Sequence, residues 1–252
     1  MDHDGYFGES VAGTYDDSTG PEFDPAVVAA TADVLAELAG GGRALELGIG
    51  TGRIALPLAA RGVDVHGIDM SRAMVDRLRA KPGGPAVPVT IGDFATARAT
   101  VDGNGQGGGS FRLVYLIFNT IMNLTTQQAQ VDCFRNAAAH LRPGGRFLIE
   151  VMVPDLRRLP PGQTAVPFAM TPTQWAFDTY EVATQSMASN YVTVENGRGT
   201  FRSVPFRYVW PAELDLMAQL AGLVPEHRWA SWARVPFTND SPKHISTWRR
   251  PG

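Results

Sequence analysis

The segment ALELGIGTGRIALPLAARGVDVHGID, residues 44–69, constrains the fold more than any other part of the chain. Its first four residues predict a buried strand, and three alternating glycines, Gly48, Gly50 and Gly52, follow directly. Glycine lets a backbone turn sharply and lie close to a ligand. A helix predicted over 53–60 and a second strand complete the segment. It therefore predicts the first strand–turn–helix–strand unit of a parallel sheet.

The same alternation continues along the chain. Further strands are predicted over 86–93, 111–119 and 146–154, and further helices over 25–38, 71–81 and 126–140. Asp24 and Ser71 are suited to cap two of these helices. Strands that alternate with helices over short loops favour a parallel sheet covered on both faces. After a helix over 210–223, two late strands are expected around 226–232 and 243–249.

Residues 155–208 break this alternation. They contain Asn196-Gly197, a dipeptide that favours a tight β-hairpin, so we expect an antiparallel β insertion after the fifth strand. The insertion is rich in aromatic residues, which either close over a small, partly apolar substrate as a lid or cover the end of the sheet. We favour the lid. The candidate substrate contacts in it are Trp175, Tyr180, Tyr191 and Arg207.

Asp69 ends the second predicted strand, where an acidic residue of a doubly wound sheet can bind both hydroxyls of a ribose. An adenosine-containing ligand is therefore expected. A dinucleotide site would have a third glycine at position 53, which is Arg53 here, and Glu46 beside the turn would repel a phosphate. S-adenosylmethionine (SAM) carries a sulfonium and an ammonium but no phosphate, so it suits this turn better than NAD does.

Five segments together resemble the class I SAM-dependent methyltransferases that modify small metabolites: ALELGIGTGRIALPLA, VHGIDMSRAMVDRLRAK, IGDF, FRLVYLIFNTIMNL and AAAHLRPGGRFLIEV. The resemblance implies a Rossmann-like, doubly wound seven-stranded sheet with an antiparallel last strand. It further implies one domain, 1–252, with an N-terminal cap at 1–23 and the substrate-side insertion at 155–208. Antibiotic-sugar N-methyltransferases share this layout, but they are usually serine-rich where this chain has FNTIMN, so their substrate is not carried over.

The resemblance also implies which residues bind SAM. They are Tyr15, Glu46, Gly48, Gly50, Gly52, Asp69, Met70, Asp93, Phe94 and Phe118. Asp69 would bind the ribose hydroxyls, Met70 would cover one adenine face, and Asp93 would accept from the adenine amino group. Phe118 would offer backbone groups to the methionyl amine, and Tyr15 would lie near the sulfonium or the carboxylate. The alternatives are capping roles for Asp69 and Asp93 and simple packing for Tyr15.

Methyl transfer from a sulfonium is an in-line displacement, for which the protein mainly has to hold the reacting atoms in line. A general base is needed only when the nucleophile enters protonated, and no histidine of this chain is favoured for that role. Asn119 and Glu150, at the expected carboxyl ends of the fourth and fifth strands, are the candidate substrate-side catalytic residues. For Glu150 the alternative is a charge pair at the end of the sheet. We assign no metal ligands.

The composition of the chain limits the kinds of partner that it can bind. The formal net charge of −3 gives no broad attraction for nucleic acid or an anionic membrane. Because the sequence has no long apolar run and no signal-peptide core, a cytoplasmic protein is expected. The resemblance implies a small-molecule methyl acceptor and a role in natural-product biosynthesis. An NAD-dependent oxidoreductase, a non-catalytic SAM-binding protein and a nucleic-acid methyltransferase remain alternatives. The acceptor atom, nitrogen, oxygen or carbon, and the oligomeric state stay open.

Overall fold

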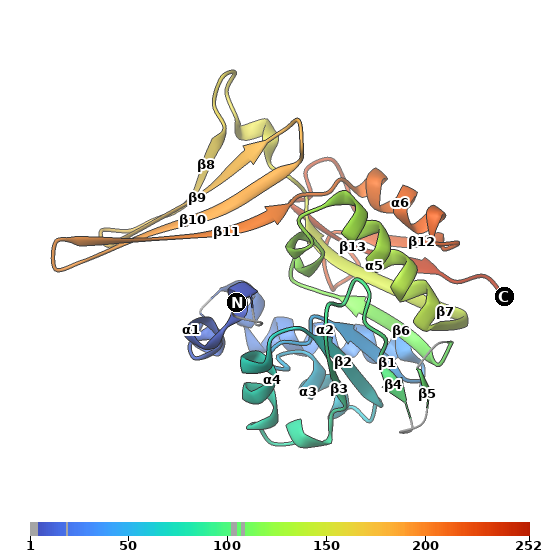
Figure 1. Ribbon diagram of the computed structural model, residues 1–252. Coiled ribbons are helices and arrows are strands. Elements are labelled where there is room, and N and C mark those ends of the chain that lie inside the picture. The colour runs from blue at the N-terminus through green and yellow to red at the C-terminus, as the bar shows by residue number, and fades with distance from the viewer. Residues whose placement is uncertain (1–4, 19, 102–104, 107–108) are drawn as a thin grey trace.

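The computed structural model describes residues 5–18, 20–101, 105–106 and 109–252. The main sheet consists of β1 (Ala44–Leu47), β2 (Val65–Asp69), β3 (Val89–Ile91), β6 (Phe111–Leu116), β7 (Leu141–Met152), β12 (Val224–Trp229) and β13 (Lys243–Arg249). Their order across the sheet is β12–β13–β7–β6–β1–β2–β3 (Figure 1). A separate short pair is formed by β4 (Thr100–Val101) and β5 (Gly105–Gln106).

Five strands of the main sheet, β3, β2, β1, β6 and β7, run parallel to one another. In contrast, β13 runs antiparallel to both β7 and β12. The predicted seven-stranded, Rossmann-like sheet with an antiparallel last strand is therefore confirmed. Because parallel strands end at the same edge of a sheet, the carboxyl ends of β1, β2, β6 and β7 meet there. This edge carries most of the predicted site residues.

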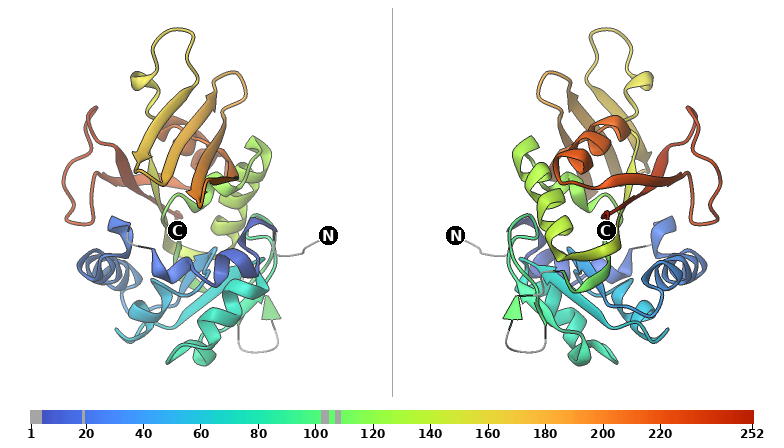
Figure 2. Two further views of the ribbon diagram at one scale, coloured as in Figure 1. Left: turned by 90° about the vertical axis from the view of Figure 1, so that its left-hand side faces the viewer. Right: turned by 90° about the vertical axis from the view of Figure 1, so that its right-hand side faces the viewer.

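Helices cover both faces of the main sheet (Figure 2). They are α1 (Glu9–Ala12), α2 (Pro25–Ala39), α3 (Ala55–Ala59), α4 (Arg72–Arg79), α5 (Gln127–His140) and α6 (Pro211–Leu220). Alternate residues of β6 enter two different cores: Leu113 and Tyr115 pack with α2 and α3, while Val114 and Leu116 pack with α5 and α6. Burial on both faces explains why the central strands are almost continuously apolar in sequence.

Side-chain caps begin these helices at the predicted positions. Asp24 Oδ1 accepts from Ala26 N at 2.7 Å at the start of α2. Ser71 Oγ accepts from Met74 N at 3.1 Å at the start of α4. Each cap satisfies an amide that the first helical turn leaves without an intrahelical partner, so the sequence correctly locates both helix starts.

Several element boundaries differ from the prediction by a few residues, and two of these differences have a clear cause. The helix expected over 53–60 is shorter, because the turn with Gly52 at φ 76° continues until Ile54 and α3 begins at Ala55. The strand expected over 146–154 begins earlier, at Leu141, because Leu141 already pairs with Phe111 before a register shift. Both differences arise from backbone geometry rather than from the apolar pattern.

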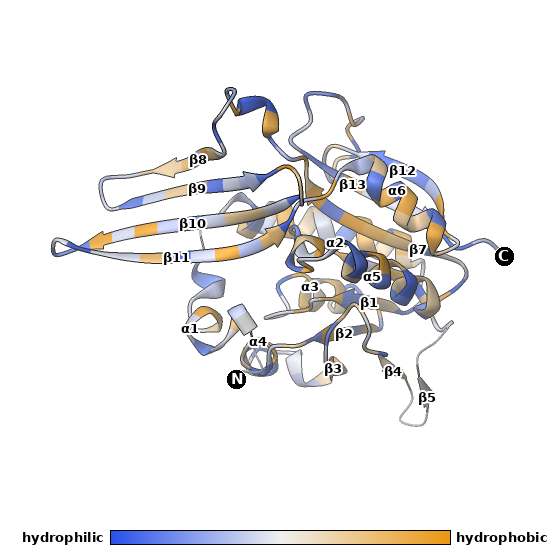
Figure 3. Cartoon of the chain, turned by 45° about the horizontal axis from the view of Figure 1, so that its top comes forward, coloured by the Kyte–Doolittle hydropathy of each residue, from blue (hydrophilic) through white to orange (hydrophobic). Residues whose placement is uncertain are grey.

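The insertion after β7 forms a second, antiparallel sheet of β8 (Ala165–Met170), β9 (Gln174–Glu181), β10 (Ser186–Glu195) and β11 (Arg198–Arg207). It projects away from the main sheet, and polar and apolar residues alternate along β10 and β11 (Figure 3). Asn196 and Gly197 connect β10 to β11 with φ values of 51° and 74°, as in a type I′ turn. The predicted antiparallel insertion and its hairpin are confirmed. Within the described ranges, no helix has the length and apolar character needed to cross a bilayer.

Candidate functional site

The glycine turn after β1 is shaped for close approach. Gly48, Gly50 and Gly52 all have positive φ values, 75°, 54° and 76°, which side chains other than glycine rarely adopt. A Cβ atom at Gly48 would lie 2.6 Å from Thr120 Cγ2, and one at Gly52 would lie 2.9 Å from Leu78 Cδ1. Gly48 therefore keeps a cradle open, whereas Gly52 permits close packing of α4.

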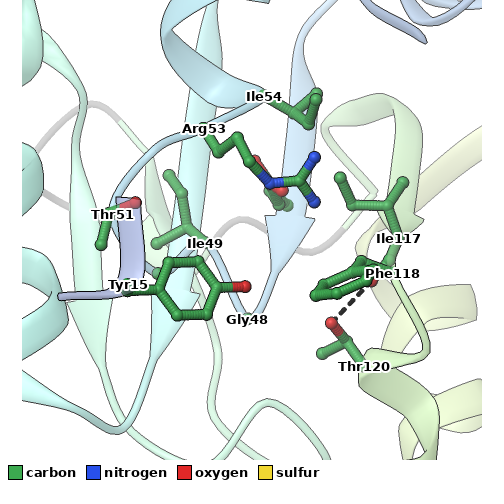
Figure 4. A pocket seen from close by; sticks show the side chains of 11 residues that line it. Tyr15, Gly48, Ile49, Thr51, Arg53, Ile54, Ile117, Phe118 and Thr120 are labelled. Atoms are coloured by element: carbon green, nitrogen blue, oxygen red, sulfur yellow. Dashed lines mark hydrogen bonds between the residues drawn. The ribbon is translucent and has the colours of Figure 1, made fainter. Parts of the chain in front are cut away.

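A pocket lies above this turn (Figure 4). Its lining residues are Tyr15, Glu46, Gly48, Ile49, Gly50, Thr51, Arg53, Ile54, Ile117, Phe118 and Thr120. Five of the predicted cofactor residues thus come together from the N-terminal segment, β1, the glycine turn and the loop after β6. The prediction missed the apolar and threonine members, because Ile and Thr are common in ordinary turns and cores.

Asp69 holds the glycine turn from the neighbouring strand. Its Oδ2 accepts from Gly50 N at 2.7 Å and its Oδ1 accepts from Ser71 N at 2.9 Å. These bonds fix the orientation of the carboxylate at the carboxyl end of β2. Asp69 is therefore linked to the pocket through Gly50, although it does not line the pocket itself.

Glu46 is a buried acid in the pocket wall. Its side chain is only 3% exposed and Oε2 accepts from the Tyr115 hydroxyl at 3.0 Å. Burial raises the pKa of Glu46 to about 8, while the Tyr115 hydrogen bond and the positive charge of Arg53 act against that rise. In the ligand-free protein Glu46 is thus mainly protonated at neutral pH, and a cation in the pocket would favour its ionised form.

The N-terminal segment closes one side of the pocket through η2 (Tyr15–Asp17). Thr51 Oγ1 donates to Asp16 Oδ1 at 2.7 Å, and Lys81 Nζ lies 2.7 Å from Asp16 Oδ2. These contacts hold Tyr15 over the glycine turn. Burial raises the pKa of Tyr15 to about 12, so its phenol stays protonated at neutral pH. Sequence reasoning found Tyr15 but missed Asp16 and Lys81, which hold it in place.

Arg53 lies between two aromatic rings at the pocket mouth. Its guanidinium carbon is 4.9 Å from the Phe23 ring centroid and 5.2 Å from that of Phe118. Arg53 Nη1 also donates to the Glu22 carbonyl at 2.6 Å. In Figure 4 the guanidinium points toward the space between Tyr15 and Phe118. A positive charge therefore faces the same space as the buried acid Glu46, and the pocket can receive a zwitterion.

The loop after β6 has two consecutive residues with positive φ, Phe118 at 54° and Asn119 at 62°. Glu150 Oε2 accepts from Phe118 N at 3.3 Å, and Asn119 Oδ1 accepts from Met152 N at 2.7 Å. The side chains of Asn119 and Glu150 thus join the ends of β6 and β7. They support a backbone conformation that is costly for residues with side chains.

Glu150 also forms an ion pair at the end of the sheet, which is the alternative to a catalytic role that the sequence analysis gave for it. Its Oε1 lies 2.7 Å from Lys243 Nζ and accepts from Trp232 Nε1 at 3.2 Å. Only 8% of the surface of Glu150 is exposed, so protein groups surround the carboxylate. This geometry favours a positioning role over direct contact with a substrate. Catalysis by Glu150 or Asn119 stays a prediction.

The predicted adenine contacts lie at the ends of β2 and β3. Met70 is 48% exposed and is therefore accessible to a ligand, while Phe94 is buried beside Gly48. Asp93 Oδ1 accepts from Ala95 N at 2.8 Å, which is the capping role considered as an alternative. Contact of these three residues with adenine stays a prediction.

The four candidate lid residues differ in their surroundings. Tyr180 and Arg207 are buried at the base of the insertion, and Arg207 Nη2 pairs with Glu213 Oε1 at 2.7 Å. Trp175 is exposed on the face that also carries Arg207, opposite the face of Tyr180 and Tyr191, and Tyr191 contacts the Phe168 ring. The structure therefore does not bring the four together into one surface, because residues at successive positions of a strand point to opposite faces. Their contact with a substrate stays a prediction.

Among the described residues, no group of three or more histidine, cysteine or acidic side chains is placed to hold a metal ion. The ionisable groups at the sheet edge include Glu46, Arg53 and Asp69. Such a set is suited to an organic ligand that carries both a positive charge and hydroxyl groups.

Comparison with known proteins gives a consistent picture. The family model described as a methyltransferase domain matches residues 44–145. The structure of the CcbJ methyltransferase from Streptomyces caelestis is similar over 98% of both chains, with 34% sequence identity and a TM-score of 0.81. The cypemycin N-terminal methyltransferase from Streptomyces sp is 29% identical over 203 residues, 77% of each chain. The SAM-bound structure of CalS10, an amino pentose methyltransferase from Micromonospora echinaspora, has the same fold, with 18% identity over 96% of both chains and a TM-score of 0.66.

Proposed function

Because this chain belongs to the class I SAM-dependent methyltransferases, we propose that it transfers the methyl group of SAM to a small-molecule acceptor. The observation that carries the proposal is a buried acid, Glu46, in the wall of a pocket that the glycine turn also lines. Bound SAM supplies an activated methyl group on a sulfonium. The chain's own task is to bind it, orient it and exclude water.

The charged groups of the pocket lining suit those of SAM. A Cβ atom at Gly48 would collide with Thr120 in the pocket wall, so only glycine leaves this part of the wall unchanged. Glu46 offers an acid to the cationic part, and Arg53 offers a guanidinium to the carboxylate. Asp69, fixed by Gly50 and Ser71, keeps its oxygens at the strand end where a ribose would lie. In this proposal Gly52 supports the turn by packing.

The remaining predicted contacts complete the proposed binding mode. Met70 and Phe94 would border the adenine and Asp93 would accept from its amino group. Phe118 and Tyr15, which both line the pocket, would border the methionyl part of SAM. Tyr15, with its raised pKa, would act there as a hydrogen-bond donor rather than as a base.

For the acceptor, the relatives support a small molecule or a peptide. The names of two similar proteins refer to a peptide N-terminus and to an amino pentose, both of which carry an amine. We propose a small-molecule acceptor in specialised metabolism, with nitrogen, oxygen and carbon nucleophiles as the classes to be tested. The insertion sheet would close over this acceptor as a lid. A cytoplasmic location stays a prediction.

The proposal is tested by incubating the protein with SAM that carries a deuterated methyl group and with a panel of acceptors. The panel contains amino sugars, amino-acid amides and cyclic secondary amines, the hydroxyl counterpart of each, and β-dicarbonyl carbon acids. The expected result is at least one acceptor that gains one deuterated methyl group with stoichiometric formation of S-adenosylhomocysteine (SAH). A protein that binds SAM and produces no SAH with any compound would instead be a SAM-binding protein without this activity.

Binding of SAM at pH 7 is expected to release roughly nine-tenths of a proton, because Glu46 has a pKa of about 8 without ligand. A neighbouring positive charge stabilises the carboxylate, so the pKa falls and the proton leaves. Calorimetry in buffers with different ionisation enthalpies measures this release. In Glu46→Gln the binding enthalpy should no longer depend on the buffer, and a buffer-independent enthalpy in the wild type would contradict the proposed position of the cation.

Asp69→Ala is expected to lower the affinity for SAH by on the order of tenfold or more. Hydrogen bonds to a charged group contribute roughly 1.5–3 kcal/mol, and the substitution also removes the acceptor that holds Gly50 N. Isothermal titration calorimetry gives the two dissociation constants. Asp76→Ala is the control, because Asp76 is an exposed residue of α4 that pairs with Arg79 on the surface. Equal affinity of Asp69→Ala and the wild type would show that the ribose is placed wrongly.

A further inference from the structure

One face of the insertion sheet carries a set of polar side chains in register. Ser189 of β10 lies directly opposite Asp178 of β9 and Val204 of β11. Two residues further along β10, Tyr191 lies opposite Arg202 of β11. Because paired residues and residues two apart point to the same side of a sheet, Asp178, Ser189, Tyr191 and Arg202 share one face.

This face is turned toward the main sheet and the N-terminal segment. At its base, Val166, Tyr180 and Met187 pack into the core that contains β7 and α5. At its far end, the Arg202 guanidinium carbon lies 5.8 Å from the Tyr6 ring centroid and 4.7 Å from that of Tyr191. Asp178 lies between these two contact regions and therefore faces inward. The views from both sides place the insertion sheet over the N-terminal segment (Figures 1 and 2).

The inward face and the pocket belong to the same electrostatic environment. Burial raises the pKa of Tyr191 on the insertion and of Tyr15 in the pocket wall, and the negative charge of Glu22 adds to both rises. Asp178 likewise contributes to the raised pKa of Tyr191. In addition, β11 packs against η5 (Thr120–Asn123), which directly follows Phe118 and Asn119. The insertion sheet that carries Asp178 is thus anchored beside the loop that borders the pocket.

Asp178 differs from the other acids near the pocket in its partners. Ser189 Oγ donates to Asp178 Oδ1 at 2.6 Å, and the Tyr180 hydroxyl lies beside the carboxyl group. Within the described part of the chain no lysine or arginine pairs with it, whereas Glu150 pairs with Lys243. Burial raises the pKa of Asp178, because the carboxylate is half-buried without a compensating cation. A cationic ligand would supply that missing compensation.

We propose that Asp178 binds the protonated amine of the methyl acceptor and takes up one of its protons. This inference rests on the proposed methyl transfer and specifies its acceptor as a basic amine. Tyr180 and Tyr191 are unsuited to take the proton, because burial raises the pKa of both phenols further above neutrality. The hydrogen bond from Ser189 Oγ to Asp178 Oδ1 orients the carboxylate.

The proton and electron balance of this step is complete. One ammonium N–H proton passes to a carboxylate oxygen of Asp178, which leaves a lone pair on nitrogen. That lone pair forms the new nitrogen–carbon bond as the electrons of the sulfur–carbon bond return to sulfur. The products are a methylated ammonium ion and the neutral thioether of SAH, and the proton on Asp178 passes to water when the acceptor leaves. No oxidant or metal is required.

The test compares Asp178→Asn with the wild type, using the panel amine that the wild type methylates fastest and the hydroxyl counterpart of that amine. Asp178→Asn keeps the shape of the side chain and removes its charge. We expect kcat/KM for the amine to fall at least tenfold and the amine's affinity for the SAH-bound protein to fall by a similar factor in calorimetry. Affinity for SAH alone and the melting temperature should remain close to those of the wild type.

Two further variants keep the test decisive. Glu181→Gln is the matched control, since Glu181 is an exposed acid at the end of the same strand and should change neither quantity. Asp178→Glu retains a carboxylate and should bind the amine more tightly than Asp178→Asn does. This variant keeps the proposal testable if Asp178→Asn folds poorly.

The inference and the proposed function fail in different ways. Equal amine kinetics in Asp178→Asn and the wild type, or a wild-type enzyme that methylates hydroxyl compounds and no amine, would overturn the role of Asp178 and leave methyl transfer intact. A wild-type protein that neither binds SAM nor forms SAH with any panel member would overturn methyl transfer itself.

Discussion

Gly48→Ala is expected to reduce the affinity for SAH by on the order of a hundredfold and to lower the melting temperature. The added Cβ would lie 2.6 Å from Thr120 Cγ2, and alanine would have to adopt a φ of 75°. Overpacking costs roughly 1–3 kcal/mol, and a left-handed conformation adds about 1–2 kcal/mol. If Thr120 moves to relieve the contact, it moves in the wall of the pocket. Calorimetry with SAH and thermal unfolding measure the two effects.

Gly62→Ala separates the steric contact from the backbone strain. Gly62 has a similarly positive φ of 82°, but a Cβ there would meet nothing within 4 Å. Only the conformational cost of about 1–2 kcal/mol should remain, with SAH affinity unchanged. If Gly48→Ala bound SAH as tightly as Gly62→Ala, the turn after β1 would not be the cradle of the cofactor.

Arg207→Met is expected to lower the free energy of unfolding by about 3–5 kcal/mol, because it leaves Glu213 buried without its cation. The Arg207 and Glu213 side chains are only 5% and 15% exposed, and Arg207 also donates to Gln130 and Gln185. These contacts connect the base of the insertion with α5 and α6. For a chain of this size the melting temperature should fall by roughly 6–20 °C.

Arg135→Met is the matched control for this substitution. Arg135 pairs with Asp132 on the surface of α5, with side chains that are 54% and 35% exposed, and such a pair contributes about 0–1 kcal/mol. A stable Arg207→Met variant that loses only acceptor turnover would instead support the sequence-based prediction that Arg207 contacts the substrate.

The local features of the fold were predictable from the sequence. Asp24 and Ser71 begin helices because their side chains satisfy free backbone amides, a property that depends on a few neighbouring residues. The hairpin at Asn196-Gly197 depends on two residues that tolerate positive φ. The parallel sheet followed from the alternation of strands and helices, and its antiparallel last strand followed from the family resemblance.

The partners of the buried polar groups were not predictable in the same way. Glu150 meets Lys243 and Trp232, which are far away along the chain, so local spacing carries no information about the pair. Nothing in the sequence distinguishes Asp178 from the other acidic residues of the chain. Its inward position emerges only from the register of β9 with β10. The glycine turn, by contrast, was recognisable because both its backbone and its neighbour Glu46 lie within one short segment.

The central claim is that the pocket above Gly48, Glu46 and Arg53 binds SAM rather than a dinucleotide. Calorimetric titration of the wild-type protein with SAM, SAH and NAD tests it most directly. We predict saturable binding of SAM and SAH, an increase in melting temperature with either ligand by mass action, and no binding of NAD at the same concentrations. Tight binding of NAD without binding of SAM or SAH would contradict the claim.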